Sequence, residues 1–247
     1  MINVYRFSSC RGVDNGGSRA ECYGWERVSD INILNTQWLF HTTKEIIYFL
    51  KLLDGYKNNN RSVNSLLPNE DYFFNNIEQI KRSLKLSDMI YIEISSLAYY
   101  MDRYGNVGQV TRIGSETKAG NIKPGVFEKY TLTEDELVKD MAYLERYFKK
   151  PIIYTGHGVT IDTNCSPEDQ LTLEREFKLK WSTIVRVMES RNLITKYIKR
   201  HAKYHLVISS ILKGCKLCLH GLNHVNKSGK EVLNKYARKL IRKVKGV

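Results

Sequence analysis

Two residue types that could carry out nucleophilic chemistry stand near opposite ends of the chain. Ser9 lies in the small, polar run Phe7-Ser8-Ser9-Cys10-Arg11-Gly12, and His224 lies in Asn223-His224-Val225-Asn226-Lys227-Ser228-Gly229. A serine hydroxyl is a weak nucleophile until a neighbouring base takes its proton, and imidazole is the usual base. These two residues are therefore a candidate nucleophile and its candidate base.

The surroundings of Ser9 predict a strand followed by a tight turn. Ile2–Phe7 is a short run of β-branched and aromatic residues, and the residues after it are small and polar with a glycine. In a parallel sheet this turn would lie at the carboxyl edge, where open α/β sheets bind ligands. The alternative is that Ser8 and Ser9 only cap the turn.

This turn resembles the first block of the SGNH/GDSL hydrolases, especially the GSCFA-like branch, in which Gly-Ser-Cys replaces Gly-Asp-Ser. Ser8 stands where that branch has glycine. The resemblance implies that Ser9 is the nucleophile and that the backbone N–H of Ser9 or Cys10 helps to hold an oxyanion. Arg11, in the same turn, is a binding candidate.

The far end of the chain predicts a basic amphipathic helix over about residues 229–245. Its apolar residues recur at helical spacing: Val232, Leu233, Tyr236, Ala237, Leu240 and Ile241. In the SGNH family the last block reads Asp-x-x-His, followed by a polar stretch and glycine. The chain is similar to this block from His224 to Gly229, which implies that His224 is the general base.

The aspartate of that block is replaced by Gly221 here. In a triad the aspartate holds the imidazole tautomer and stabilises its cation. Three explanations stay open: His220 or a nearby carbonyl orients His224, or Asp162 substitutes for the missing acid, or the fold serves binding rather than catalysis.

The middle of the chain continues the alternation of strands and helices. Strands are predicted at Met89–Ser96 and Lys150–Gly158, and amphipathic helices at His41–Leu53, with a threonine cap, and at Asp135–Phe148. This order predicts one α/β domain over residues 1–247, a three-layer α/β/α sandwich with a mainly parallel sheet. The SGNH resemblance implies the same flavodoxin-like fold.

Two further residues follow the predicted middle strands. Ser96 stands where SGNH enzymes carry a Gly-x-Asn-Asp block, whose asparagine donates to the oxyanion, and a serine hydroxyl could donate as well. The alternative for Ser96 is a backbone role at the strand end. His157, in a Gly-His-Gly turn, is a binding candidate for the same cleft.

Composition favours a globular protein. The 247 residues are 42% hydrophobic with a mean hydropathy of -0.40, and no run of about 18 apolar residues predicts a membrane span. The first residues lack a secretory signal, so we expect a cytoplasmic protein with reduced thiols. Polar loops are predicted at about 56–70 and 102–124, the second being a lid candidate.

The net charge is +13, and basic residues crowd the last 20 positions. Lys235, Lys239 and Arg242 would lie on the polar side of the predicted terminal helix. Such a face attracts polyanionic glycans, nucleic acids or acidic membranes. The alternative is an ordinary solvated face, and no named nucleic-acid motif accompanies it.

A zinc site is a separate alternative at the same end of the chain. Cys215, Cys218, His220 and His224 fall within ten residues, and sulfur and imidazole are zinc ligands. Structural zinc sites usually close a longer loop, so we expect no metal here. Zinc would also occupy His224 and exclude its role as a base.

The leading hypothesis is a serine esterase or O-acyltransferase that acts on an acylated glycan or a similar small ester and needs no cofactor. The alternative is a catalytically degenerate SGNH-like binding or structural protein. It would contact an anionic partner, either a polyanionic glycan or a nucleic acid, through its basic C-terminal helix.

Overall fold

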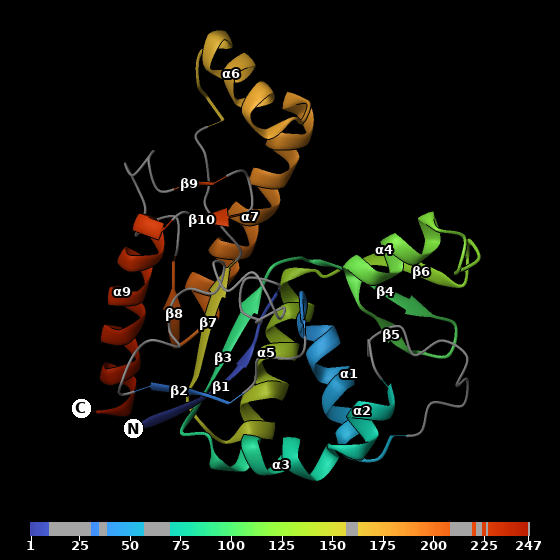
Figure 1. Cartoon of the computed structure of the whole chain (residues 1–247), viewed down its shortest axis with the longest axis vertical. Coiled ribbons are helices and arrows are strands. Elements are labelled where there is room, and N and C mark those ends of the chain that lie inside the picture. The colour runs from blue at the N-terminus through green and yellow to red at the C-terminus, as the bar shows by residue number, and fades with distance from the viewer. Residues whose placement is uncertain are drawn as a thin grey trace.

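A five-stranded parallel sheet forms the centre of the molecule (Figure 1). The computed structural model describes residues 1–9, 31–34, 39–56, 70–156, 163–207, 219–220, 224–225 and 227–246. The strand order is β2-β1-β3-β7-β8, and every neighbouring pair is parallel. The strands are β1 Ile2–Phe7, β2 Ile31–Ile33, β3 Met89–Ile94, β7 Ile152–Gly156 and β8 Tyr204–Leu206. The predicted mainly parallel α/β fold is confirmed.

The chain reverses its direction of travel across the sheet between β1 and β3. From β1 it moves outward to β2, then returns to place β3 on the other side of β1, with Val4 opposite Met89 and Phe7 opposite Ile92. In open α/β sheets, ligands bind at the carboxyl ends of the strands that flank such a reversal.

Both faces of the sheet are covered, which gives three layers. Side chains alternate between the faces. One face carries Tyr5, Phe7 and Ile92, and the other carries Val4 and Tyr91. The first face packs against several helices: α1 Thr43–Leu53, α2 Glu70–Asn75, α3 Ile77–Leu86, α5 Glu134–Phe148 and α7 Trp181–His201. The second packs against α9 Lys227–Lys245, which is the one helix on that face within the described part of the chain (Figure 1).

Five phenylalanine rings form the centre of the larger core. Phe49 of α1 lies 5.1 Å from the Phe40 ring, 5.3 Å from the Phe73 ring and 6.2 Å from the Phe7 ring, measured between centroids. Phe7 also lies 5.7 Å from Phe148 of α5. These edge-to-face and tilted contacts fix α1 and α5 against the end of β1.

Threonine caps begin helices α1 and α5, and the cap of α1 was predicted from the sequence. The Thr42 hydroxyl accepts from the N–H of Glu45, and Thr133 and Glu136 form a reciprocal capping box. Each cap satisfies N–H groups that have no partner within the helix. Helix α1 starts directly beside the carboxyl edge of the sheet, since the carbonyl of His41, just before its cap, accepts from the N–H groups of Ser95 and Ser96.

Helix α9 runs antiparallel to the strands and starts two residues before the predicted boundary. Leu233, Ala237 and Ile241 are buried, while Tyr236, expected on the apolar side, is exposed. At its end, Lys245 Nζ donates to Asp88 Oδ1 beside the start of β3, and this bond lowers the pKa of Asp88. The 19 residues of α9 span about 28 Å, so its beginning lies toward the carboxyl edge.

The predicted loop at 102–124 contains regular structure. Strand β5 Val107–Gly108 and helix α4 Val110–Lys118 lie within it, and β5 joins β4 Ala98–Asp102 and β6 Phe127–Thr131 in an antiparallel sheet. The glycines that suggested a loop mark its turns, since Gly105 and Gly120 have φ of +81° and +78°. Of the predicted loop at 56–70, residues 57–69 lie outside the described part of the chain.

Three more elements complete the described chain. Helix α6 Pro167–Phe177 and the first turns of α7 project beyond the sheet (Figure 1), and a short hairpin pairs β9 Leu219–His220 with β10 His224–Val225. None of the helices in the described residues is both long and apolar enough to cross a lipid bilayer.

The aromatic core makes a stability prediction. Phe49→Ala should lower the free energy of unfolding by about 3–5 kcal/mol, because it removes a fully buried ring that contacts three others. Phe74→Ala is the matched control, since Phe74 is 49% exposed, and should cost about 1 kcal/mol or less. Urea denaturation measures both, and equal costs would contradict this description of the core.

Candidate functional site

Polar side chains are buried at the carboxyl end of the sheet, on the face that α9 covers. Arg6 and Ser8 lie on the same face of the sheet as Val4, because they follow it at every second position along the chain. Glu93 lies on the same face as Tyr91 for the same reason. All three are almost fully buried. Burying a charged or polar group costs free energy unless it is hydrogen-bonded, so such a group in the middle of a sheet indicates a specific role.

The carboxylate of Glu93 holds Ser9 by two hydrogen bonds. Ser9 donates to Glu93 Oε2 from its backbone N–H at 3.1 Å and from its hydroxyl at 3.0 Å, and both residues are fully buried. The Ser9 hydroxyl and the Glu93 carboxylate thus meet across the β1–β3 switch point. The backbone N–H of Ser9, expected as a possible oxyanion donor, is occupied by Glu93 in this arrangement.

His41 ties the surrounding loops to this edge. Its carbonyl accepts from the N–H groups of Ser95 and Ser96 at 2.9 and 3.0 Å, and its own N–H donates to Glu45 Oε2 at 2.5 Å. The preceding Phe40 donates to the carbonyl of Ser8 at 2.9 Å. The segment before α1 therefore crosses the ends of both central strands and covers Ser9.

The imidazole of His41, which was not among the predicted site residues, lies at this edge of the sheet. Its Nδ1 is buried without a hydrogen-bond partner and lies 3.7 Å from Glu45 Oε2. The other oxygen of Glu45 accepts from the N–H of Val110 at 2.8 Å, which attaches α4 to α1. Glu45 is thus a fully buried carboxylate that organises the loop around the site.

Ser96 lies at the carboxyl edge, as its position after β3 predicts. Its hydroxyl donates to the carbonyl of Ala98 at 3.0 Å and accepts from the N–H of Ala98 at 2.9 Å. These bonds correspond to the alternative that the sequence analysis gave for Ser96, a backbone role at the end of the strand. The hydroxyl would have to leave its own turn to reach an oxyanion.

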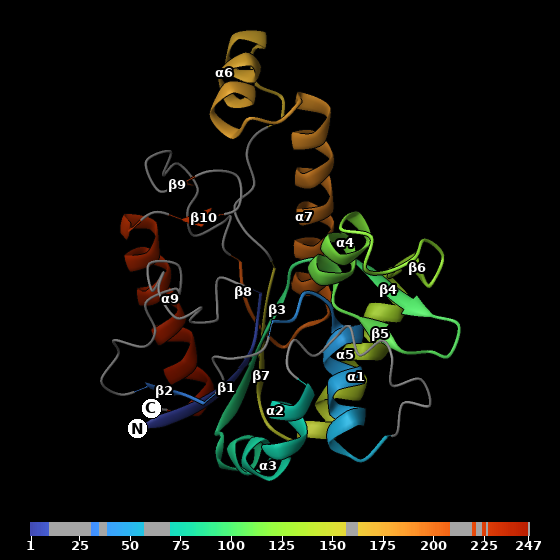
Figure 2. The same cartoon turned by 45° about the vertical axis from the view of Figure 1, so that its right-hand side comes forward.

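The backbone of His224 lies on the same side of the molecule as Ser9. His224 pairs with His220 across the β9–β10 hairpin, which leads into the first turn of α9. Figures 1 and 2 both place this hairpin beyond the carboxyl ends of the strands. The side chain of His224 lies outside what the structure describes, as do the candidates Cys10, Arg11, His157 and Asp162.

The alternative zinc cluster also falls outside the described part. Cys215 and Cys218 are not described, and only the backbone is described for His220 and His224. Among the residues that the structure does describe, no group of three or more histidine, cysteine, aspartate or glutamate side chains could hold a metal ion.

Sequence reasoning missed Glu93, although one signal could have indicated it. Glu93 is the charged residue in an otherwise apolar strand, Met-Ile-Tyr-Ile-Glu-Ile. A carboxylate there must meet a donor from a neighbouring strand, because the strand is buried on both faces. The register of β1 against β3, which brings Ser9 to Glu93, could not be predicted from the spacing of residues in the sequence.

Comparison with models of known protein families gives no match, and comparison with curated proteins gives no significant match either.

The Ser9–Glu93 contact makes a prediction about stability. Glu93→Ala should destabilise the fold by about 1–3 kcal/mol more than Glu93→Gln, because the alanine leaves two buried donors of Ser9 unpaired while an amide oxygen can still accept them. Chemical denaturation of both variants measures the difference. Indistinguishable costs would mean that these hydrogen bonds contribute nothing to stability.

Proposed function

We propose that this protein is a serine esterase or O-acyltransferase of the SGNH type, with Ser9 as its nucleophile and His224 as its general base. The observation that carries the proposal is the position of Ser9 at the carboxyl end of β1, against the buried carboxylate of Glu93. In open α/β sheets, substrates bind beside such a reversal of strand order.

In the proposed reaction, Ser9 Oγ attacks the acyl carbonyl carbon as its proton passes to His224. The carbonyl oxygen becomes an oxyanion, which the backbone N–H of Cys10 would stabilise, with Ser96 as a second donor if its hydroxyl turns outward. The tetrahedral intermediate expels the alcohol, which takes the proton from His224. Water or an acceptor hydroxyl then attacks the acyl-enzyme and gives its proton to His224, which returns it to Ser9 Oγ as the bond between Ser9 and the acyl group breaks.

Glu93 would keep Ser9 in place before substrate arrives. The hydrogen bond from the Ser9 hydroxyl to Glu93 would orient that hydroxyl. The hydroxyl must rotate from Glu93 toward His224 for reaction. Because Ser9 is fully buried, the loops over it must also open to admit an ester.

The substrate class that we propose is an acylated glycan or a similar small ester. Arg11 and His157 would contact it from the loops that follow β1 and β7. With no aspartate three residues before His224, turnover should be slow, because the orientation of the imidazole would depend on other groups.

The test is hydrolysis of p-nitrophenyl acetate together with covalent labelling by a fluorophosphonate. Ser9→Ala and His224→Ala should each abolish both, with the double variant no worse than either single one, since the two residues act as a unit. Ser95→Ala is the matched control, because Ser95 lies at the same edge and its hydroxyl is 3.4 Å from the carbonyl of His41. It should keep the activity.

Two results would contradict the proposal. Activity that survives in Ser9→Ala would come from another nucleophile, such as a surface lysine or a cysteine. A folded wild-type protein that neither turns over the ester nor takes the label at Ser9 would favour binding over catalysis.

A second candidate function is binding of an anionic partner by a catalytically degenerate protein. Two observations favour it: both donors of Ser9 are occupied by Glu93, and Lys235, Lys239 and Arg242 are exposed along one side of α9. Residues at i, i+4 and i+7 share a helix face. This face, turned away from the sheet, would contact a polyanionic glycan or a nucleic acid.

Removing these three charges should reduce retention on heparin and flatten the salt dependence of binding, because fewer counterions are released. The matched control replaces three exposed lysines outside α9, so that its net charge equals that of the α9 variant. These lysines are Lys85, Lys118 and Lys178. Elution at a lower salt concentration for the α9 variant than for the control supports binding through α9. Equal elution would mean that only net charge matters.

A further inference from the structure

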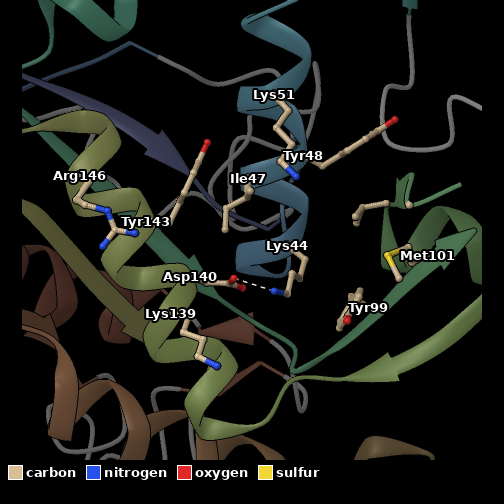
Figure 3. Close-up of a pocket in the computed structure, with 12 residues that line it drawn as sticks. Lys44, Ile47, Tyr48, Lys51, Tyr99, Met101, Lys139, Asp140, Tyr143 and Arg146 are labelled. Atoms are coloured by element: carbon tan, nitrogen blue, oxygen red, sulfur yellow. Dashed lines mark hydrogen bonds and ion pairs between the residues drawn. The ribbon is translucent and has the colours of Figure 1, made fainter. Parts of the chain in front are cut away.

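A cavity of about 450 Å³ lies between α1, α5 and the β4–β5 hairpin, and none of its lining residues belongs to the Ser9–Glu93 site (Figure 3). Pockets for small ligands usually range from about 300 to 1,000 Å³, so this volume suits a compact molecule. The lining of the cavity includes the cations Lys44, Lys51, Lys139 and Arg146.

The lining is strongly cationic. Asp140 is the one acid among its described residues, and this buried carboxylate already accepts from Lys44 Nζ at 2.8 Å and from the Thr43 hydroxyl at 2.6 Å. Lys51, Lys139 and Arg146 form no ion pair within the described part of the chain. Three positive charges around the cavity are therefore left without a bound counter-charge.

Neighbouring acids outside the lining form no ion pair with these three cations within the described part of the chain. Glu136, one turn before Lys139, accepts hydrogen bonds from Thr133 in the cap of α5, and these bonds, followed by the charges of Lys44 and Lys139, lower its pKa. Asp54 accepts from the hydroxyl of Tyr147 at 3.0 Å. The cations of the cavity remain available to an anion from solution.

Three tyrosine rings in the lining are held in place by contacts with other side chains. The Tyr48 hydroxyl donates to Asn106 Oδ1 at 2.9 Å, and Tyr99 stacks on Tyr130 at 5.5 Å between centroids. Tyr143 stacks on Tyr147 at 6.2 Å. Figure 3 shows Tyr48 on α1, Tyr143 on α5 and Tyr99 on β4, so each wall of the cavity contributes one ring.

Rings fixed in this way bind a ligand at little entropic cost, because they lose little further freedom. Ile47, Met101 and Val107 add apolar surface between the rings. An inorganic ion would leave this apolar surface unused, while a long polyanion would extend well beyond the lining residues. The lining therefore suits a ligand with both an anionic group and a flat ring.

We infer that this cavity binds a small phosphorylated molecule with a flat ring, of the size of a nucleoside monophosphate. Its phosphate would lie among Lys44, Lys51 and Arg146, and its ring would lie against the tyrosines. The site is separate from the proposed ester chemistry at Ser9.

The test is isothermal titration of the full chain with AMP at low salt, with adenosine and inorganic phosphate as comparison ligands. AMP should bind about tenfold or more tightly than either, because it alone supplies both the charge and the ring. The double variant Lys51→Ala/Arg146→Ala should weaken AMP binding about tenfold or more. The matched control Arg82→Ala/Lys85→Ala removes the same charge from α3 and should change it less than about twofold.

Several outcomes would overturn the inference: no heat of binding with AMP, equal affinity for AMP and phosphate, or equal weakening by the cavity and control variants. The Ser9→Ala variant should bind AMP like the wild type. This result separates a failure of the cavity site from a failure of the proposed catalytic function.

Discussion

Five parallel strands must be covered on both faces, and the rest of the structure depends on that constraint. Parallel strands need long crossover connections, which place helices over the sheet and bury both of its sides. Strand β3 meets this requirement with a nearly continuous apolar run, and its side chains divide between the two cores. Because all five strands point the same way, their carboxyl ends meet at one edge, and the candidate site lies there.

Glu93 departs from the apolar pattern of β3. A carboxylate at a fully buried position in a central strand is unfavourable unless donors satisfy it, and an apolar residue there would serve the fold as well or better. The two donors of Ser9 satisfy one of its oxygens. Local departures from a stable pattern concentrate at functional positions, which is why this contact supports the proposal for Ser9.

Helix α1 connects the two sites that we describe. Its first turn, with Thr42 and Glu45, organises the loop over Ser9, while Lys44 and Tyr48 line the cavity on its other side. The Thr43 and Lys44 bonds to Asp140 fasten α1 to α5, and the phenylalanine core fastens it to β1. Both sites therefore rest on one rigidly packed helix.

The sequence by itself determined the elements whose signals are local. Short apolar runs rich in β-branched and aromatic residues located β1, β3 and β7. Helical periodicity located α1, α5 and α9, with a threonine cap as a further signal for α1. The position of Ser9 at a strand end followed from the same reasoning. The short edge strands β2 and β8 and the structure within 102–124 were missed, since three-residue strands and glycine-marked turns carry little periodic signal.

Only the tertiary structure decided the strand order and the partners that it brings together. Ser9 and Glu93 are 84 residues apart, and Thr43 and Asp140 are 97 apart. No local pattern encodes these pairs, because the register of β1 against β3 and the packing of α1 on α5 depend on how the whole core fills. The same holds for the cavity, whose cations and rings come from three elements that meet only in the folded chain.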